Sequence, residues 1–365
     1  MNIGEYKKIL KETTIVEYPA YYQHKLIKFL KDEKIIYNDR RYKKEDDLFD
    51  VTQYDKASEK LSYIIDELDG GIKAIENFEY SRGYRYCTLF SINNYSDELL
   101  EGLKKENRII EYSEDNATID QVASIAKNPT YKVCDDKTIL KFSFLLTNKE
   151  KKEKRIKYPV LAIIHKEINT LEIRLDTVQF EYRTNETFYK DKVNDVLAWL
   201  KNLLTLDKEK NQCIQIGNIN FQAVVKFMRA QKTDEVTIVA LKMRREGMVA
   251  YLDAAANEDL TIPILGELKK VLNKNEKLFS STKETLLIKK LMWEFIEEIE
   301  ETSSLPSVKV LWGDKKIKVL LTHEYQKEEY TLFKYSDELG NEEMMNYVTK
   351  YIINCKRELD EEFDN

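Results

Sequence analysis

Three stretches of the sequence decide the fold: TILKFSFLLT at residues 138–147, KRIKYPVLAII at 154–164 and LEIRLDTVQF at 171–180. Each is rich in β-branched and aromatic residues, which favour β-strands. Only short polar segments separate them, and connections of that length join antiparallel strands but cannot join parallel ones. We therefore predict an antiparallel sheet in the middle of the chain.

A strongly amphipathic helix is predicted after these strands, at 185–206. Its apolar residues recur at helical spacing and comprise Phe188, Val193, Val196, Leu197, Leu200 and Leu203. Antiparallel strands followed by a helix that can cover them are typical of an α+β domain. We assign residues 131–210 to this central domain.

The N-terminal segment, 1–130, is predicted to be a small α/β domain. Its second helix, at 53–68, ends at Gly70 and Gly71. After it, strand patterns at 84–92, 108–112 and 130–134 alternate with helical patterns at 96–106 and 118–127. Alternation at this spacing predicts parallel pairing between the strands.

The C-terminal segment, 211–365, carries a second α+β pattern. Its predicted helices lie at 221–229, 263–279, from Ser281 and Thr282 onward, and at 342–357; its predicted strands lie at 213–216, 236–243, 308–312, 317–322 and 330–335. The end of this segment predicts a helix, three antiparallel strands and a helix. The whole chain is therefore predicted to be mixed α+β with three domains, and a length of 365 residues is ordinary for several small domains.

The composition excludes several classes of protein. With only 10 Gly and 5 Pro, glycine-rich phosphate-binding loops are nearly excluded, and neither GxGxxG nor GxxxxGK[ST] occurs. A net charge of −6 argues against a general polyanion binder, although a local basic face is compatible with it. The abundance of Lys, Ile, Asn, Glu and Tyr indicates an AT-rich, bacterial or phage, origin.

A cytoplasmic location is predicted. The N-terminus, MNIGEYKKIL, lacks the apolar core of a signal peptide, and no apolar run approaches the roughly 18 residues of a membrane span. Cys87, Cys134, Cys213 and Cys355 are widely spaced, which is typical of reduced thiols. We expect no membrane partner.

Metal and nucleophile motifs are not evident. The three histidines, His24, His165 and His323, have no second His or Cys at ligand spacing. No GxSxG motif occurs either. We predict no metal site and no cofactor.

Glu172, Arg174 and Asp176 are the weak catalytic candidates. They share one face of a predicted strand, because side chains alternate along a strand. Two carboxylates beside a cation resemble the site of a metal-dependent nuclease of the PD-(D/E)XK type, and Mg²⁺ would be expected only in that case. Arg replaces the Lys of that pattern, however, and no Pro-Asp precedes it. The favoured interpretation is a solvated strand face opposite Leu171, Ile173 and Leu175.

A basic stretch is the candidate nucleic-acid surface. It comprises Lys226, Arg229, Lys232, Lys242, Arg244 and Arg245, with Phe221 and Phe227 nearby. Cations with aromatic rings can contact phosphates and stack on bases. In a lysine-rich chain such stretches are more often simply solvated.

Three functions follow from these patterns. The first is a non-catalytic interaction or adaptor subunit of a larger intracellular assembly that binds protein partners, since Tyr is enriched in interfaces and 23 are present. Bacterial anti-phage defence is one setting for such a chain. The alternatives are a metal-dependent nuclease and a sequence-indifferent DNA- or RNA-binding protein. Under the first, polar groups are expected to lie on solvated faces without converging in the interior.

Overall fold

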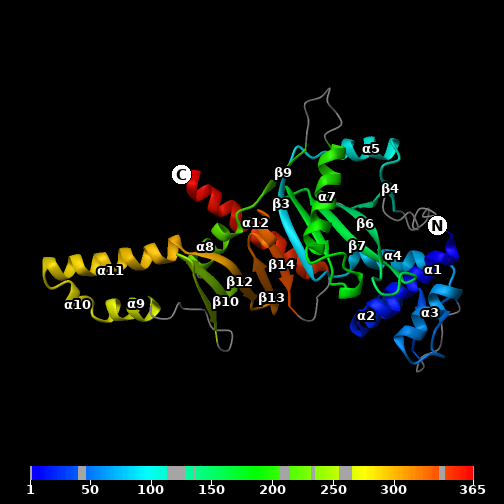
Figure 1. Ribbon diagram of the computed structural model, residues 1–365, viewed down its shortest axis with the longest axis horizontal. Coiled ribbons are helices and arrows are strands. Elements are labelled where there is room, and N and C mark those ends of the chain that lie inside the picture. The colour runs from blue at the N-terminus through cyan, green and yellow to red at the C-terminus, as the bar shows by residue number, and fades with distance from the viewer. Residues whose placement is uncertain are drawn as a thin grey trace. The chain divides into compact units, whose positions relative to one another are not determined.

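The computed structural model describes residues 2–39, 47–112, 128–134, 136–204, 214–231, 235–254, 265–336 and 342–364. The chain forms two compact units. Unit 1 comprises Met1–Asn218 with Gly340–Met345, and unit 2 comprises Ile219–Leu339 with Asn346–Asn365. Both mix helices with largely antiparallel strands, which confirms the predicted α+β class (Figure 1).

The sheet of unit 1 has the strand order β9-β3-β8-β7-β6-β5-β4. The strands are β3 (Tyr86–Asn93), β4 (Ile110–Glu111), β5 (Thr130–Val133), β6 (Lys137–Thr147), β7 (Arg155–His165), β8 (Thr170–Leu175) and β9 (Gln215–Asn218). β6, β7 and β8 pair antiparallel, as predicted. β4 and β5 pair parallel as expected, but β3 pairs antiparallel with β8 and β9.

Helices of unit 1 form two groups. The first comprises α1 (Ile3–Lys11), the π-helix η1 (Glu12–Glu17), α2 (Ala20–Asp32), α3 (Ala57–Glu67) and α4 (Gly71–Ser81), with the short parallel pair β1 (Ile36–Tyr37) and β2 (Phe49–Asp50). The remaining elements are α5 (Asp97–Lys105), η2 (Phe180–Tyr182) and α7 (Phe188–Leu204). The helix predicted at 118–127 lies outside the described residues.

The two faces of the β6–β7–β8 sheet carry different side chains. On the first face the rings of Phe142 and Tyr158 contact Trp199 and Phe188 of α7 at centroid distances of 5.1 and 5.3 Å. The second face carries the odd-numbered residues of β6 and β7, and α1, η1 and α4 pack against it. Both faces are therefore buried, and charged residues on the second face lie in the interior.

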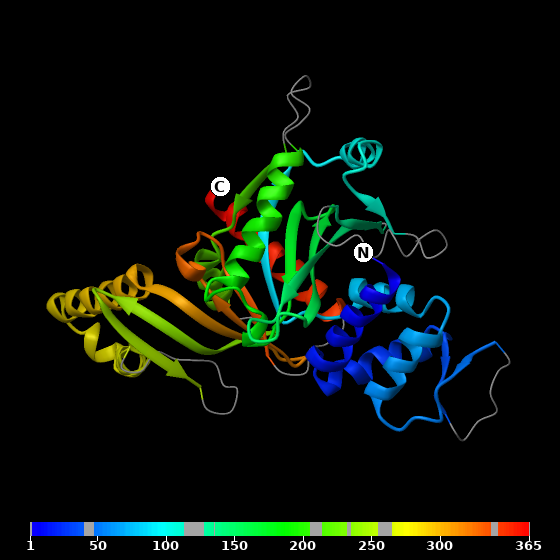
Figure 2. The ribbon, with the colours of Figure 1, turned by 45° about the vertical axis from the view of Figure 1, so that its right-hand side comes forward.

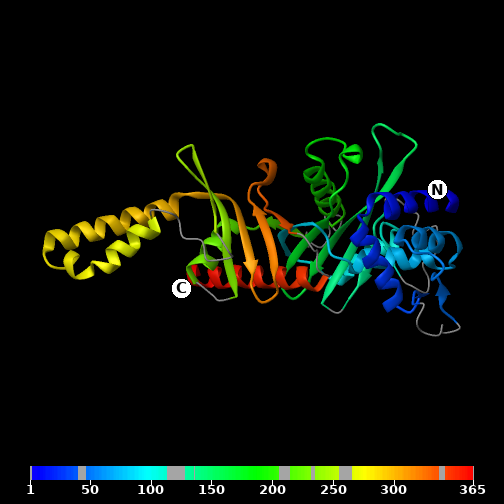
Figure 3. The ribbon, with the colours of Figure 1, turned by 90° about the horizontal axis from the view of Figure 1, so that it is seen from below.

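Unit 2 contains a five-stranded antiparallel sheet in the order β11-β10-β12-β13-β14. Its strands are β10 (Val236–Arg245), β11 (Met248–Asp253), β12 (Ser304–Trp312), β13 (Ile317–Thr322) and β14 (Leu332–Tyr335), and its other elements are α8 (Phe221–Gln231), α9 (Leu265–Lys274), α10 (Glu276–Phe279), α11 (Lys283–Thr302), η4 (Tyr325–Lys327) and α12 (Glu342–Asp364). α12 lies across one face of these strands, where Tyr351 meets Trp312 edge-on (Figure 3). The predicted three-strand unit is present, extended by β10 and β11.

The elements that were not predicted include α1, η1, β2, α4 and β11. β11 follows β10 through a two-residue turn at Glu246 and Gly247, both with positive φ, as in a tight hairpin. α4 begins at Gly71, directly after the left-handed Gly70. α3 has already ended at Glu67, so Gly70 is the N-cap of α4 and Gly71 lies inside it, where the sequence predicted only the end of a helix. None of the described helices is long and apolar enough to span a membrane.

Candidate functional site

Four charged side chains meet inside unit 1. Glu76 and Glu79 lie one turn apart on α4, and Lys141 and Lys157 come from β6 and β7. Nζ of Lys141 lies 2.9 Å from Glu79 Oε2, and Nζ of Lys157 lies 2.6 Å from the same oxygen. Both lysines also bind the carboxylate of Glu76, which accepts a further hydrogen bond from the hydroxyl of Tyr6. We call these four residues the buried quartet.

Charge balance makes the buried quartet tolerable. All four side chains are shielded from solvent, and two ammonium groups face two carboxylates. Burial by itself would raise the pKa of Glu76, but Lys141 and Lys157 outweigh it and lower the pKa to about 2. Glu76 therefore stays ionised at neutral pH.

A second charged cluster occupies β7 and β8. Nε of Arg174 donates to Glu172 at 2.7 Å, and the ring of His165 lies 2.8 Å from the other carboxylate oxygen. Burial opposes the charge of Glu172, but Arg174 and His165 lower its pKa to about 2. Asp176, just past the strand, accepts a hydrogen bond of 2.6 Å from Arg82.

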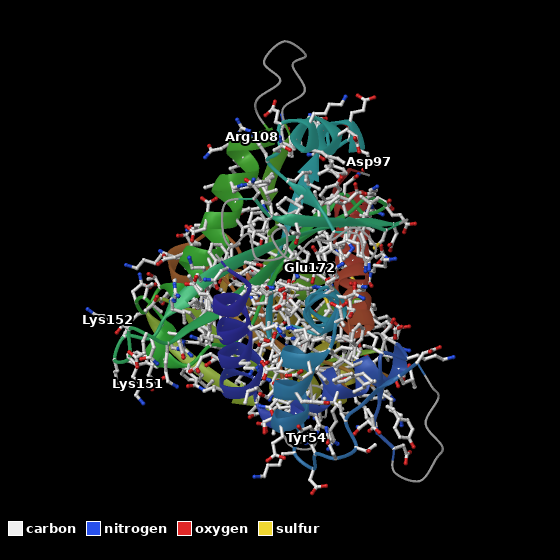
Figure 4. The ribbon with its side chains drawn as sticks, turned by 90° about the vertical axis from the view of Figure 1, so that its right-hand side faces the viewer. Tyr54, Asp97, Arg108, Lys151, Lys152 and Glu172 are labelled. Carbon is white, nitrogen blue, oxygen red and sulfur yellow. The ribbon has the colours of Figure 1, made fainter. Side chains whose placement is uncertain are left out.

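The prediction that this face of the strand is exposed to solvent is therefore wrong. Glu172 and Arg174 are 0% exposed and Asp176 is 6% exposed. Figure 4 shows Glu172 within the packed interior, whereas Lys151 and Lys152 project outward. The reason is that this face of the sheet lies in the interior: α1 and η1 pack on β7, and Arg82, just after α4, bonds to Asp176. The expectation that charged groups would not converge in the interior is wrong for the same reason.

The described residues do not bring Glu172 and Asp176 into a metal-binding group. Glu172 is bonded to Arg174 and Asp176 to Arg82. Among the parts of the chain that the structure describes, no three His, Cys, Asp or Glu side chains are placed to hold a metal ion. What the buried quartet and the Arg82–Asp176 pair do chemically is fix α4 and its end to the sheet through charge-assisted hydrogen bonds, whereas Glu172, Arg174 and His165 link β8 to β7.

A cavity of about 370 Å³ opens beside these clusters, between η1 and the strand ends. Its lining comprises Thr13, Val16, Glu17, Tyr18, Pro19, Tyr22, Arg82, Ile156, Lys157, Tyr158, Pro159, Asp176, Thr177, Val178 and Gln179. Glu17 is the last residue of the π-helix. Such helices are rare in proteins, and those that occur are often found at functional sites. Burial raises the pKa of Glu17 to about 7.

The basic candidates of unit 2 are placed on α8 and β10. Arg245 donates to Glu298 of α11 at 2.9 Å, and Arg229 lies 3.6 Å from Glu300 of the same helix. Lys242 lies over the ring of Tyr251. Lys226 and Arg244 are on the same two elements, and Lys232 lies outside the described residues. Two of these cations are thus neutralised by neighbouring glutamates.

Helices α9, α10 and α11 form an arm that extends away from the strands of its own unit (Figures 1 and 2). Leu272 and Ile296 are completely buried between the helices, and Lys269 pairs with Glu300 at 2.7 Å. Seven large apolar side chains on the arm are nevertheless exposed by half or more: Val271, Leu278, Leu286, Leu287, Ile288, Leu291 and Phe295. Exposed apolar side chains gathered in this way are typical of interaction surfaces in general.

Sequence reasoning missed most of these residues. The quartet's carboxylates lie on α4, whose Ile72, Ile75 and Phe78 recur at helical spacing and were a usable signal. Lys141 and Lys157 each interrupt an apolar strand, which also could have marked them as buried cations. Comparison with protein-family models, curated proteins and solved structures finds no match to this chain.

Proposed function

We propose that this chain is a non-catalytic interaction subunit of a larger assembly, and that it binds a second copy of itself through α11. The observation that carries the proposal is the exposed apolar stripe of Leu287, Ile288, Leu291 and Phe295, each exposed by 50–57%. These residues share one face because positions three and four apart are neighbours on a helix. Away from this stripe, Ile296 of α11 is completely buried, and Glu300 of α11 pairs with Lys269 of α9.

The stripe has the symmetry that a pair of identical helices requires. A two-fold interface uses the same patch on both subunits, so that residue i meets j and j meets i. Leu287 and Phe295 stand four residues on either side of Leu291. In an antiparallel pair, Leu287 of each copy would meet Phe295 of the other, with the two Leu291 side chains at the centre.

Charge favours the antiparallel arrangement over the parallel one. The exposed charges of the first half of α11 are Lys283, Glu284 and Lys290, and those of the second half are Glu294, Glu297 and Glu298. Parallel helices would align the two acidic halves. Antiparallel helices place each acidic half against the more basic one, and like charges at close range are thereby avoided.

The other two functions have less support. A nucleic-acid surface needs available cations, and Arg229 and Arg245 are engaged by glutamates of α11. A nuclease needs carboxylates that can reach a metal ion, and Glu172 is bonded to both Arg174 and His165. A cytoplasmic setting is part of the proposal, since Cys134 and Cys355 are thiols rather than halves of a disulfide.

The test is the solution mass of the full chain by light scattering across a range of concentrations. We expect a dimer that the double variant Leu291→Glu, Phe295→Glu converts to a monomer, because four carboxylates would be buried in the paired stripe. Leu286→Glu is the matched control. Leu286 is exposed to 54% but lies off the stripe, so its variant should remain dimeric.

Other outcomes overturn the proposal. A wild-type chain that is monomeric at every concentration excludes self-association through α11. Retardation of DNA that weakens steeply with salt and is lost on reversing Arg244 and Arg245 to Glu would favour the nucleic-acid function. Mg²⁺-dependent plasmid degradation that is lost in Asp176→Ala would favour the nuclease.

A further inference from the structure

The cavity beside η1 contains polar atoms that have no partner within the described residues. Oε1 of Glu17 accepts a hydrogen bond of 2.7 Å from the backbone N–H of Gln179, but its buried Oε2 accepts none. The residue Tyr18 is only 7% exposed, and its buried hydroxyl likewise has no hydrogen-bond partner among the described residues. Buried polar atoms are normally satisfied, so each such atom calls for a physical explanation.

We infer that this cavity binds a small organic cation, a primary amine, with its ammonium group on Oε2 of Glu17. An ammonium carries three donors and can satisfy this buried acceptor. The aliphatic part of the amine would contact Val16, Ile156 and Val178, which line the same cavity. A volume of about 370 Å³ is in the range of small-molecule sites.

Charges around Glu17 favour a cation. Burial raises the pKa of Glu17 most, and the neighbouring carboxylates of Glu181 and Asp176 raise it further. The backbone N–H of Gln179 and the guanidinium of Arg183 act in the opposite direction without restoring the ordinary value. The carboxylate of Glu17 is therefore under-compensated, and a bound ammonium supplies the missing positive charge.

The two cations that line the cavity are already compensated. Arg82 pairs with Asp176, and its guanidinium lies over the rings of Tyr18, Tyr22 and Tyr84 at 4.0 to 5.3 Å. Lys157 belongs to the buried quartet, where Glu76 and Glu79 balance it. The hydroxyls of Tyr22 and Tyr158 donate to the backbone oxygens of Gly83 and Asp176. An anion in this cavity would be repelled by the carboxylates of Asp176 and Glu17.

The experiment measures binding of three probes of equal length to the full chain by calorimetry: n-butylammonium, n-butanol and butyrate. We expect n-butylammonium to bind about ten-fold more tightly than n-butanol, the gain of one charge-assisted hydrogen bond. Glu17→Gln should remove that preference while keeping the shape of the side chain. Glu150→Gln, which neutralises an exposed carboxylate outside the cavity, is the matched control and should leave it unchanged.

The pH dependence provides a second reading that needs no variant. Protonation of Glu17 competes with the ammonium, so affinity for n-butylammonium should fall as the pH drops below about 7. Carbon NMR of the Glu17 carboxyl should also show its pKa lowered by saturating n-butylammonium. Equal binding of amine and alcohol, amine binding unaffected by Glu17→Gln, or a preference for butyrate would each overturn the inference.

Discussion

Nζ of Lys157 lies 2.6 Å from Oε2 of Glu79, and both side chains are almost completely shielded from solvent. Lys157 comes from a strand and Glu79 from a helix, so their bond ties α4 to the sheet. Transferring two charges from water to the interior is costly, and the attraction between them offsets that cost only when the bonds are well formed. The quartet meets this condition because each lysine contacts both carboxylates.

Removing one cation from the buried quartet should be severely destabilising. Lys157→Met leaves an uncompensated carboxylate in the interior, and we expect the free energy of unfolding to fall by about 3–5 kcal/mol. Urea unfolding followed by circular dichroism measures the change. Lys151→Met, at an exposed lysine, is the control and should change the free energy by less than about 0.5 kcal/mol.

A double-mutant cycle separates the charge effect from lost packing. Lys157→Met combined with Glu79→Leu restores the balance, since Glu76 and Lys141 remain as a pair. The double variant should therefore be more stable than Lys157→Met alone. A double variant that is less stable than either single variant would refute the assignment of charge imbalance as the cause.

Acid should destabilise the fold through Glu76 and Glu172. Both have pKa values of about 2 in the folded chain, well below the ordinary value of about 4.3 for an unfolded glutamate. Their stabilisation is complete above that unfolded value and is lost as the pH falls toward 2. The expected loss is on the order of 2–3 kcal/mol for each carboxylate.

The free energy of unfolding measured between pH 7 and pH 2.5 checks this expectation. Glu172→Gln cannot titrate at this position, so its free energy should fall less steeply below pH 4.5 than that of the wild type. Glu150→Gln serves as the exposed control, with the wild-type slope. Identical slopes for wild type and Glu172→Gln would show that Glu172 does not contribute.

Local sequence patterns predicted where strands and helices lie better than they predicted which faces of those elements are buried. The strands at 138–147 and 154–164 and the helix at 185–206 are present as β6, β7 and α7, because their periodicity reflects their own geometry. The strand predicted at 171–180 is present only in its first half, since β8 ends at Leu175 and residues 180–182 form the 3-10 helix η2. Which face of β8 is solvated depends instead on what packs against it. The segments that pack on this face of the sheet, α1 and η1 on β7 and Arg82 on Asp176, come from the first 82 residues of the chain, far away in sequence.

The candidate site could not be predicted from the sequence for a related reason. The quartet joins residues up to 81 positions apart, and Glu17 faces Gln179 across 162 positions. No spacing rule predicts such encounters from a single sequence. The exposed stripe of α11 was equally hidden, because Leu287 and Leu291 on an amphipathic helix ordinarily indicate a core-facing side.

A pair of glycine substitutions should distinguish the roles of Gly71 and Gly102. A Cβ added at Gly71 would lie 2.7 Å from the backbone oxygen of Ile64, a contact that α3 and α4 can relieve only by moving apart. Gly71→Ala should cost about 1–3 kcal/mol. Gly102, on the exposed side of α5, has nothing within 4 Å, so Gly102→Ala should be stabilising by up to about 1 kcal/mol. Thermal unfolding of both variants measures the difference, and equal shifts would contradict it.

His323 should make the stability of unit 2 depend on pH between about 6.5 and 4. Burial lowers the pKa of His323 to about 4 in the folded chain, while an unfolded histidine titrates near 6.5. Below pH 6.5 the unfolded state therefore binds a proton that the folded state does not. The contribution of neutral His323 is complete above pH 6.5 and declines by on the order of 2–3 kcal/mol as the pH falls to 4. The buried ring lies just after β13, and its Nδ1 shares a hydrogen bond of 2.8 Å with the hydroxyl of Thr331.

Fluorescence of Trp312, which is buried in β12, reports on unit 2 once Trp199 and Trp293 are replaced by Phe. In that background, guanidinium unfolding should show the loss of stability between pH 6.5 and 4, and His323→Gln should flatten it because an amide does not titrate. Thr331→Val removes the hydrogen bond to the ring but leaves the imidazole able to titrate. Its unfolding free energy should be lower at every pH while still falling below pH 6.5. A wild-type profile that is already flat across this range would mean that burial does not keep His323 neutral.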